Sequence, residues 1–156
     1  MAAEIERKFL LKNDRWREQV SRQQLIAQGY LANTELGSVR VRLMGDQAFL
    51  SIKSMTLGVT RTEFEYPIPG ADAQYILHHL CLGPIIEKTR FFVPQDQHLW
   101  EIDVFEGDNA GLVVAEIELD TADEEFLKPD WLGAEVSDDP RYYNVKLIEH
   151  PYRLWR

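Results

Sequence analysis

Hydrophobic and polar residues alternate along most of this chain, which is the pattern of β-strands with one buried face. We predict strands over eight segments: 3–11, 23–32, 38–44, 47–54, 60–68, 84–93, 98–106 and 112–120. Gly45-Asp46 predicts a hairpin turn between the third and fourth segments, and Asp96 marks another turn between the sixth and seventh. The chain is therefore predicted to be rich in antiparallel β-structure.

Helical signals are fewer and shorter than the strand signals. Caps and apolar spacing predict three or four short helices: over 15–20 after Asn13-Asp14, over 71–81, after the capping-box pattern Thr121-Ala122-Asp123-Glu124, and from Pro140 to about Ile148. About eight strands with so few helices predict an α+β fold in which the strands form an antiparallel sheet or a barrel.

Charged residues recur at alternate positions inside the predicted strands. They form these segments: Glu4-Ile5-Glu6-Arg7-Lys8, Arg40-Val41-Arg42, Ser51-Ile52-Lys53, Arg61-Thr62-Glu63-Phe64-Glu65, Lys88-Thr89-Arg90, Glu101-Ile102-Asp103 and Glu116-Ile117-Glu118. Alternate residues of a strand face the same side, so each segment has one charged and one largely apolar face. For any one segment, the simplest interpretation is a half-buried sheet with a solvated charged face. Here, however, glutamate and arginine predominate and the two signs segregate strand by strand, which favours a charged interior.

If the strands close into a barrel, the charged faces line the lumen and the apolar faces pack outward. The lumen would then hold Lys8, Arg40, Arg42, Lys53, Arg61, Lys88 and Arg90, together with Glu4, Glu6, Glu63, Glu65, Glu101, Asp103, Glu116 and Glu118. Buried charges are costly without partners. Carboxylates bind hard divalent cations, and arginine and lysine bind phosphate oxygens. The pattern therefore predicts a metal-bound polyanion and a phosphoryl-transfer site.

Length and composition narrow the class of protein. The 156 residues predict a single domain over residues 1–156. The 17 basic and 26 acidic residues give a net charge of −9, which argues against nucleic-acid binding. We find no apolar run long enough to span a membrane and no secretory signal peptide. The one cysteine, Cys81, cannot form an internal disulfide, so a cytoplasmic protein is expected.

Taken in order, the charged motifs resemble those of the CYTH superfamily, the triphosphate tunnel metalloenzymes. Glu4-Ile5-Glu6-Arg7-Lys8 resembles the ExExK signature of that family. The resemblance runs nearly end to end through the other charged segments, Gln28-Gly29-Tyr30-Leu31 and Arg141-Tyr142-Tyr143-Asn144. The short bacterial inorganic tripolyphosphatases are the most similar members. The resemblance implies an eight-stranded antiparallel barrel that forms a tunnel, with a few short helices outside it and at one end.

The resemblance also implies roles for individual residues. Phosphate would be bound by Lys8, Arg40, Arg42, Lys53, Arg61, Lys88 and Arg90. Mg²⁺ or Mn²⁺ would be bound by Glu4, Glu6, Glu63, Glu65, Asp103, Glu116 and Glu118, whereas Glu101 matches the family less firmly. Lys8 and Tyr30 would be catalytic. The implied reaction is hydrolysis of inorganic tripolyphosphate to diphosphate and phosphate.

Several alternatives stay open at this point. Thiamine triphosphatase and nucleoside triphosphatase are close to the implied reaction, and the short chain argues against a class IV adenylyl cyclase. A non-catalytic polyphosphate-binding module would need the basic residues more than the acidic ones. The predicted helix from Arg141 to Ile148 either plugs one tunnel mouth, bringing Lys146 toward the lumen, or packs outside. The preferred metal and the existence of a homodimer are also open.

Overall fold

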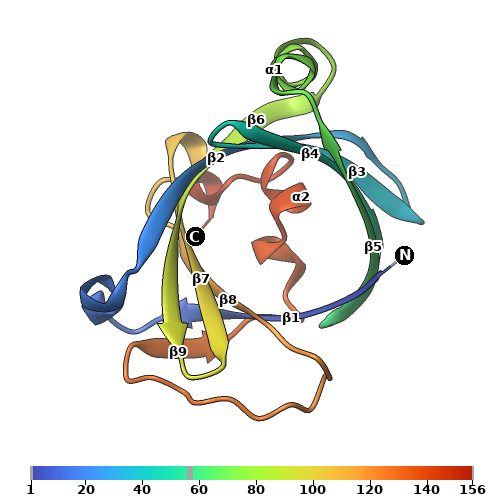
Figure 1. The fold of residues 1–156 in the computed structure, drawn as a ribbon. Coiled ribbons are helices and arrows are strands. Elements are labelled where there is room, and N and C mark those ends of the chain that lie inside the picture. The colour runs from blue at the N-terminus through green and yellow to red at the C-terminus, as the bar shows by residue number, and fades with distance from the viewer. Residues whose placement is uncertain (1, 56–57, 156) are drawn as a thin grey trace.

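The computed structural model describes residues 2–55 and 58–155, and eight of the strands within these ranges form a closed antiparallel barrel (Figure 1). The strands are β1 (Ala2–Leu11), β2 (Arg22–Asn33), β3 (Gly37–Met44), β4 (Gln47–Ser54), β5 (Thr60–Ile68), β6 (Leu82–Gln95), β7 (His98–Phe105), β8 (Val113–Glu118) and β9 (Leu132–Glu135). The eight predicted strands and the barrel are therefore confirmed. The short strand β9 was not predicted.

The strands follow one another around the ring in the order β1-β5-β4-β3-β2-β6-β7-β8, and β8 then pairs with β1. β1 closes the ring because it pairs with β5 through residues 2–5 and with β8 through residues 6–9. β9 pairs with the far end of β1, where the register shifts between Phe9 and Leu11. Closure leaves none of the eight barrel strands as a free edge.

Two tight turns lie where the sequence predicts them. Gly45 has φ +61 at the first position of the two-residue turn between β3 and β4, where a type II′ turn needs a glycine. Asp96 has φ 53 in the turn between β6 and β7. Both hairpins therefore keep neighbouring strands in the register that puts their charged faces on one side.

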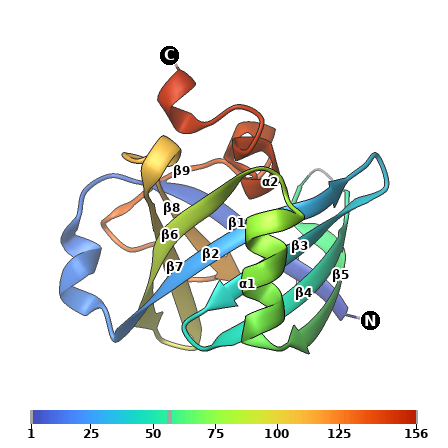
Figure 2. The same cartoon turned by 90° about the horizontal axis from the view of Figure 1, so that it is seen from above.

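The helices are short and lie outside the barrel or at one end of it. The described residues form α1 (Gly70–His79), α2 (Asn144–Leu147) and four 3₁₀ helices, at Arg15–Gln19, Gly107–Asn109, Pro140–Tyr142 and Tyr152–Leu154. Figure 2 shows α1 lying across the outside of the strands, and α2 with the rest of the C-terminal segment at one end. The continuous helix predicted from Pro140 to Ile148 is thus broken at Tyr143. No helix in the described part of the chain is long and apolar enough to cross a membrane.

The helix predicted after the capping box at Thr121 is wrong. The box forms only a turn, in which an oxygen of Glu124 accepts a hydrogen bond from the backbone N–H of Asp120 at 2.7 Å. The chain then runs without helix, and Phe126 packs edge-on against Phe9 and Trp100 at centroid distances of 5.9 and 5.7 Å. Burial of this ring on the sheet competes with continuation of the helix and prevails over the local capping signal.

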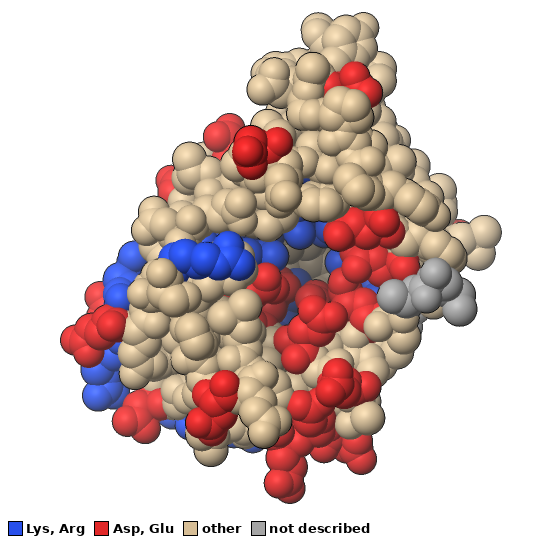
Figure 3. All heavy atoms as spheres, viewed as in Figure 1, with Lys and Arg blue, Asp and Glu red and all other residues tan. Residues whose placement is uncertain are grey.

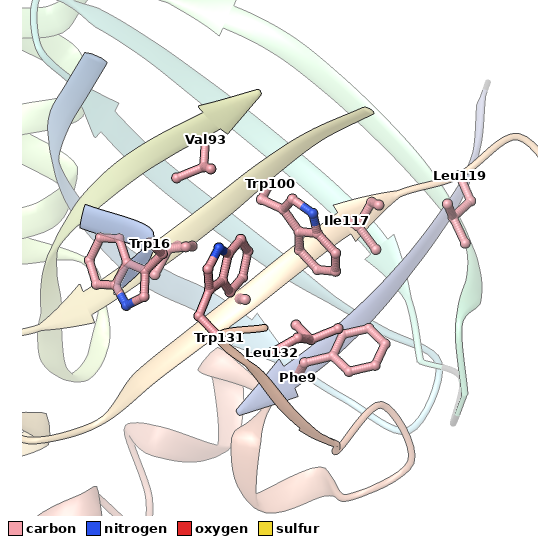
Figure 4. Close-up of a cluster of buried hydrophobic side chains, with 10 residues drawn as sticks. Phe9, Trp16, Val93, Trp100, Ile117, Leu119, Trp131 and Leu132 are labelled. Atoms are coloured by element: carbon pink, nitrogen blue, oxygen red, sulfur yellow. The ribbon is translucent and has the colours of Figure 1, made fainter. Parts of the chain in front are cut away.

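The hydrophobic core of the described residues has three clusters, two of which lie outside the barrel wall. Its largest cluster packs on the outer faces of β1, β6, β7 and β8, where Trp100 and Trp131 meet edge to face at 5.5 Å (Figure 4). A second cluster, which includes Val41 and Leu77, lies between the barrel and α1. The apolar faces of the strands therefore point mainly outward, as predicted. A third cluster, which includes Tyr30, Ile86 and Tyr143, joins the strands to the C-terminal segment.

Candidate active site

The barrel encloses a cavity of about 560 Å³, and the space-filling view looks into its hollow, which basic and acidic side chains surround (Figure 3). All eight barrel strands contribute to its wall. The predicted site residues found there are Glu4, Glu6, Lys8, Tyr30, Arg40, Arg42, Lys53, Arg61, Glu63, Glu65, Lys88, Arg90, Glu101, Glu116 and Glu118. Alternate residues of each strand face the same side, and fifteen of the sixteen predicted lumen and catalytic residues therefore line one cavity.

Acidic and basic side chains occupy opposite sides of this cavity. The neighbouring strands β8, β1 and β5 carry Glu116, Glu118, Glu4, Glu6, Glu63 and Glu65, which we call the acidic wall. Across the ring, the neighbouring strands β3, β2 and β6 carry Arg40, Arg42, Arg22, Lys88 and Arg90, which we call the basic wall. Lys8 and Arg61 are the basic residues on the acidic side. A polyanion on the basic wall would face carboxylates, and a divalent cation between them would relieve the repulsion.

The acidic wall contains a like-charged pair. Glu6 and Glu118 are directly opposite each other in the β1–β8 register, an arrangement that destabilises a sheet. Neither forms a salt bridge among the residues that the structure describes. Burial and then the charge of Glu116 raise the pKa of Glu6, and burial and then Glu4 raise the pKa of Glu118. Within the described ranges, no group of three or more His, Cys, Asp or Glu side chains is already arranged to hold a metal ion. The closely spaced carboxylate oxygens of the acidic wall nevertheless fit a hard divalent cation.

Salt bridges hold Glu4 and Glu63 of the acidic wall in place. Lys53 Nζ lies 3.0 Å from Glu4 and 3.5 Å from Glu63. Arg61 Nε is 3.8 Å from Glu4, and an Arg40 guanidinium nitrogen is 3.9 Å from Glu63. These pairs connect the consecutive strands β1, β5, β4 and β3 on one side of the ring, so the cations are positioned before any ligand arrives.

Arg40 has a donor that no residue satisfies. Its side chain is 7% exposed, and its Nε has no hydrogen-bond partner in the described part of the protein. A buried donor left without a partner costs about 1–3 kcal/mol, so such groups normally have a ligand or water to bind. An anion in the cavity would supply the missing acceptor.

Asp103 takes a different place from the one predicted. Its carboxylate does not line the cavity, because it accepts two hydrogen bonds from Arg90 at 2.8 and 3.0 Å and lies 2.7 Å from Lys88 Nζ. Burial alone would raise the pKa of Asp103, but Arg90 and Lys88 lower it. In the structure Asp103 thus anchors two basic side chains, and its role as a metal ligand stays a prediction. Glu101, 3.3 Å from Arg90, lines the cavity on this strand.

The C-terminal segment closes one end of the barrel. Tyr143, Asn144 and Val145 line the cavity, and Figure 1 shows α2 within the ring of strands when the barrel is viewed along its axis. The plug interpretation is therefore correct, but the residue that approaches the lumen is Asn144, since Lys146 is not on the cavity wall. The oxygen of Asn144 accepts a hydrogen bond from Lys88 Nζ at 2.9 Å.

Lys8 and Tyr30 both lie at this closed end. Lys8 Nζ is 3.4 Å from Glu116, donates to the backbone oxygen of Tyr142 at 3.3 Å and lies 5.6 Å from the ring centroid of Tyr143. Tyr30 packs in the same buried cluster as Tyr143 and also lines the cavity. The two predicted catalytic side chains thus come from opposite strands of the ring and meet the same part of the C-terminal segment.

Sequence reasoning missed several residues that line or adjoin the cavity. Arg22, whose guanidinium carbon lies 3.7 Å from the ring centroid of Phe92, lines the cavity, as do Phe92 and Phe49. Gln28 is fully buried and donates to the Asn144 oxygen at 3.1 Å. Every second residue of β2, counted back from Tyr30 toward the start of the strand, should face the same side. This count would have found Gln28 and Arg22.

Comparisons with known proteins agree with this geometry. A family model described as the CYTH domain matches residues 2–146. A curated inorganic triphosphatase of Acetivibrio thermocellus is 43% identical over 156 residues, which cover 100% of this chain and 99% of that protein. One of Nitrosomonas europaea is 35% identical over 149 residues, which cover 92% and 95%.

Solved structures give the same result. A crystal structure of an inorganic triphosphatase matches with a TM-score of 0.67 and 33% identity, over 93% of this chain and 97% of that chain. The resemblance seen in the charged motifs is therefore confirmed by the family model, by relatives along the whole chain and by the fold. This chain belongs to the CYTH domain family.

Proposed function

We propose that this protein hydrolyses inorganic tripolyphosphate to diphosphate and phosphate with the help of a divalent metal ion. The observation that carries the proposal is the cavity itself, in which a basic wall faces an acidic wall. The relatives named inorganic triphosphatase support the same activity. A single domain over residues 1–156 and a cytoplasmic location remain predictions.

The basic and the acidic residues of the cavity are proposed to bind different parts of the metal-bound substrate. The basic residues Lys8, Arg40, Arg42, Lys53, Arg61, Lys88 and Arg90 would hold the phosphate oxygens. The carboxylates of Glu4, Glu6, Glu63, Glu65, Glu116 and Glu118 would hold Mg²⁺ or Mn²⁺. Such an ion, when bound, neutralises phosphate charge and helps to position the attacking water.

The chemical step is assigned to the closed end of the cavity. As an ammonium, Lys8 Nζ has three N–H donors. Among the described residues it meets Glu116 and the Tyr142 carbonyl, which leaves one donor for a water molecule or a leaving oxygen. Tyr30 would act with Lys8 on the attacking water or the leaving group. The surrounding cations hold the transferred phosphoryl group and spread its charge.

Phosphate release from a panel of substrates tests the proposed activity. The purified protein with Mg²⁺ or Mn²⁺ should hydrolyse tripolyphosphate faster than thiamine triphosphate or ATP. Faster hydrolysis of either organic triphosphate would reassign the substrate. Tight binding of tripolyphosphate without any hydrolysis would instead identify a non-catalytic binding module.

Diphosphate should be a much poorer substrate than tripolyphosphate. The basic residues come from five strands, β1, β3, β4, β5 and β6. Two linked phosphates are too few to contact all of them at once. Each charge-assisted contact that a shorter chain fails to make is expected to lower kcat/KM by roughly 10- to 150-fold. Phosphate release at matched substrate concentrations measures the ratio. Equal rates of hydrolysis for diphosphate and tripolyphosphate would mean that the cavity does not select substrates by their number of phosphates.

Arg40→Ala should raise KM for tripolyphosphate by roughly 10- to 150-fold and lower kcat much less. The reason is that Arg40 is assigned a phosphate contact made equally in the ground state and the transition state. Arg7→Ala is the matched control, because Arg7 lies on the outer face of β1 and pairs with Glu135. Steady-state kinetics on both variants measure KM and kcat for tripolyphosphate and test this assignment. A kcat that falls further than KM rises would place Arg40 in the chemical step instead.

A further inference from the structure

Arg42 differs from the other six proposed phosphate ligands in its partner. Six of the seven proposed phosphate ligands have a carboxylate within salt-bridge distance. Among the described residues Arg42 has none, and its Nε donates instead to the amide oxygen of Gln28 at 3.0 Å. Burial, and then the charges of Arg40 and Arg90, lower the pKa of Arg42 to about 9. At neutral pH the side chain is still a cation, and its charge is not cancelled by a neighbouring carboxylate.

Gln28 forms hydrogen bonds both with Arg42 and with the C-terminal segment at the closed end of the cavity. It lies on β2, between β3 and β6, and is directly opposite Arg42 in the strand register. Its side chain is fully buried. While its oxygen accepts from Arg42, its amide nitrogen donates to the oxygen of Asn144, which also accepts from Lys88.

The orientation of this chain of hydrogen bonds is fixed at both ends. Arg42 has only donors, so it must meet an oxygen, and Lys88 Nζ donates to Asn144 at 2.9 Å. Asn144 must therefore turn its oxygen toward Lys88, and that same oxygen takes the Gln28 nitrogen. Only the Gln28 oxygen is then left for Arg42. A side chain at this position needs one acceptor and one donor, and an amide supplies both.

From this geometry we infer that Gln28 is a positioning residue, which orients Arg42 toward phosphate without cancelling its charge and connects it through Asn144 to Lys88. A glutamate could also accept from Arg42, but it would neutralise the cation and could not donate to Asn144. An apolar residue would leave Arg42 charged but unoriented. The inference rests on the proposed function, because it needs phosphate as the ligand of Arg42.

A double-mutant cycle tests whether Gln28 acts through Arg42. Calorimetry would measure the binding of inorganic tripolyphosphate in chelator, where no turnover occurs, to the wild type, Gln28→Met, Arg42→Met and the double variant. We expect Gln28→Met to weaken binding about tenfold in the wild-type background and less than about twofold in the Arg42→Met background. Gln28→Glu should weaken binding about as much as Arg42→Met. Gln23→Met, an exposed position on the same strand, is the control.

The outcomes separate the inference from the proposed function. If the effects of Gln28→Met and Arg42→Met simply multiply, or if Gln28→Met binds normally, the inference is wrong while the proposed function stands. If the wild type neither binds nor hydrolyses tripolyphosphate, the proposed function fails and the inference fails with it. Thermal unfolding identifies a variant that does not fold. Should Gln28→Met be such a variant, Gln28→Asn gives the same cycle, because it keeps an amide but moves it one methylene away from Arg42.

Discussion

Replacing Lys8 with alanine should lower kcat for tripolyphosphate by about 10²- to 10⁴-fold, while the substrate still binds. Lys8 Nζ lies at the closed end of the cavity, next to Glu116 and the carbonyl of Tyr142. In this position it is proposed to act on the attacking water or the leaving group. A contact needed mainly in the transition state lowers kcat when it is lost and leaves ground-state binding nearly intact.

Lys53→Ala provides the matched control for this result. Lys53 is also a lumen lysine with carboxylate partners, at 3.0 Å from Glu4 and 3.5 Å from Glu63, but it is assigned only to phosphate binding. Its loss should raise KM more than it lowers kcat. Steady-state kinetics, with tripolyphosphate binding measured separately by calorimetry, distinguish the two lysines. A near-normal kcat for Lys8→Ala at saturating substrate would make Lys8 a phosphate ligand only.

Removal of divalent metal by a chelator should abolish hydrolysis, and added Mg²⁺ or Mn²⁺ should restore it. Without the cation, the carboxylates of the acidic wall repel a polyanion held on the basic wall. The pair Glu6 and Glu118 is the centre of this repulsion, because the two residues are opposite each other and form no salt bridge among the described residues. Phosphate release before and after chelation and after metal addition measures the effect.

Two controls sharpen the chelation experiment. Thermal unfolding in chelator must show that the protein is still folded, so that loss of activity is not loss of structure. Glu6→Gln should reduce the response to added metal, since it removes one of the two facing charges. Full hydrolysis in the presence of chelator would contradict the metal assignment altogether.

The strand pattern of the sequence was enough to predict most of the barrel and its lumen. Alternation in β1, β3, β5 and β8 assigns charged and apolar residues to opposite faces, and this assignment does not depend on which strands pair. It places Arg40 and Arg42 inside and Val41 outside, as the structure has them. What alternation leaves out is the position of a residue along the barrel axis and the partner that it meets.

The features that the sequence did not show depend on those contacts. Asp103 has the correct parity, but its cross-strand partner Arg90 and the neighbouring Lys88 take up its carboxylate. The capping signal at Thr121 is local, whereas the burial of Phe126 against Trp100 is a long-range contact. Asn144 reaches the lumen only because the C-terminal segment folds back onto the barrel end. Neither spacing nor propensity carries this kind of information.

The way in which β1 closes the ring also has a consequence for folding kinetics. β1 comes first among the strands of the chain, yet its partners are β5, β8 and β9, and Lys8 pairs with Glu116. Contacts this far apart in sequence carry a large loop-closure cost and form slowly. Until β8 has joined, one side of β1 has unpaired backbone groups that can associate with another chain. The acidic wall spans this seam, so its carboxylates come together only in the ring-closing step, where divalent cations should favour closure by screening their repulsion.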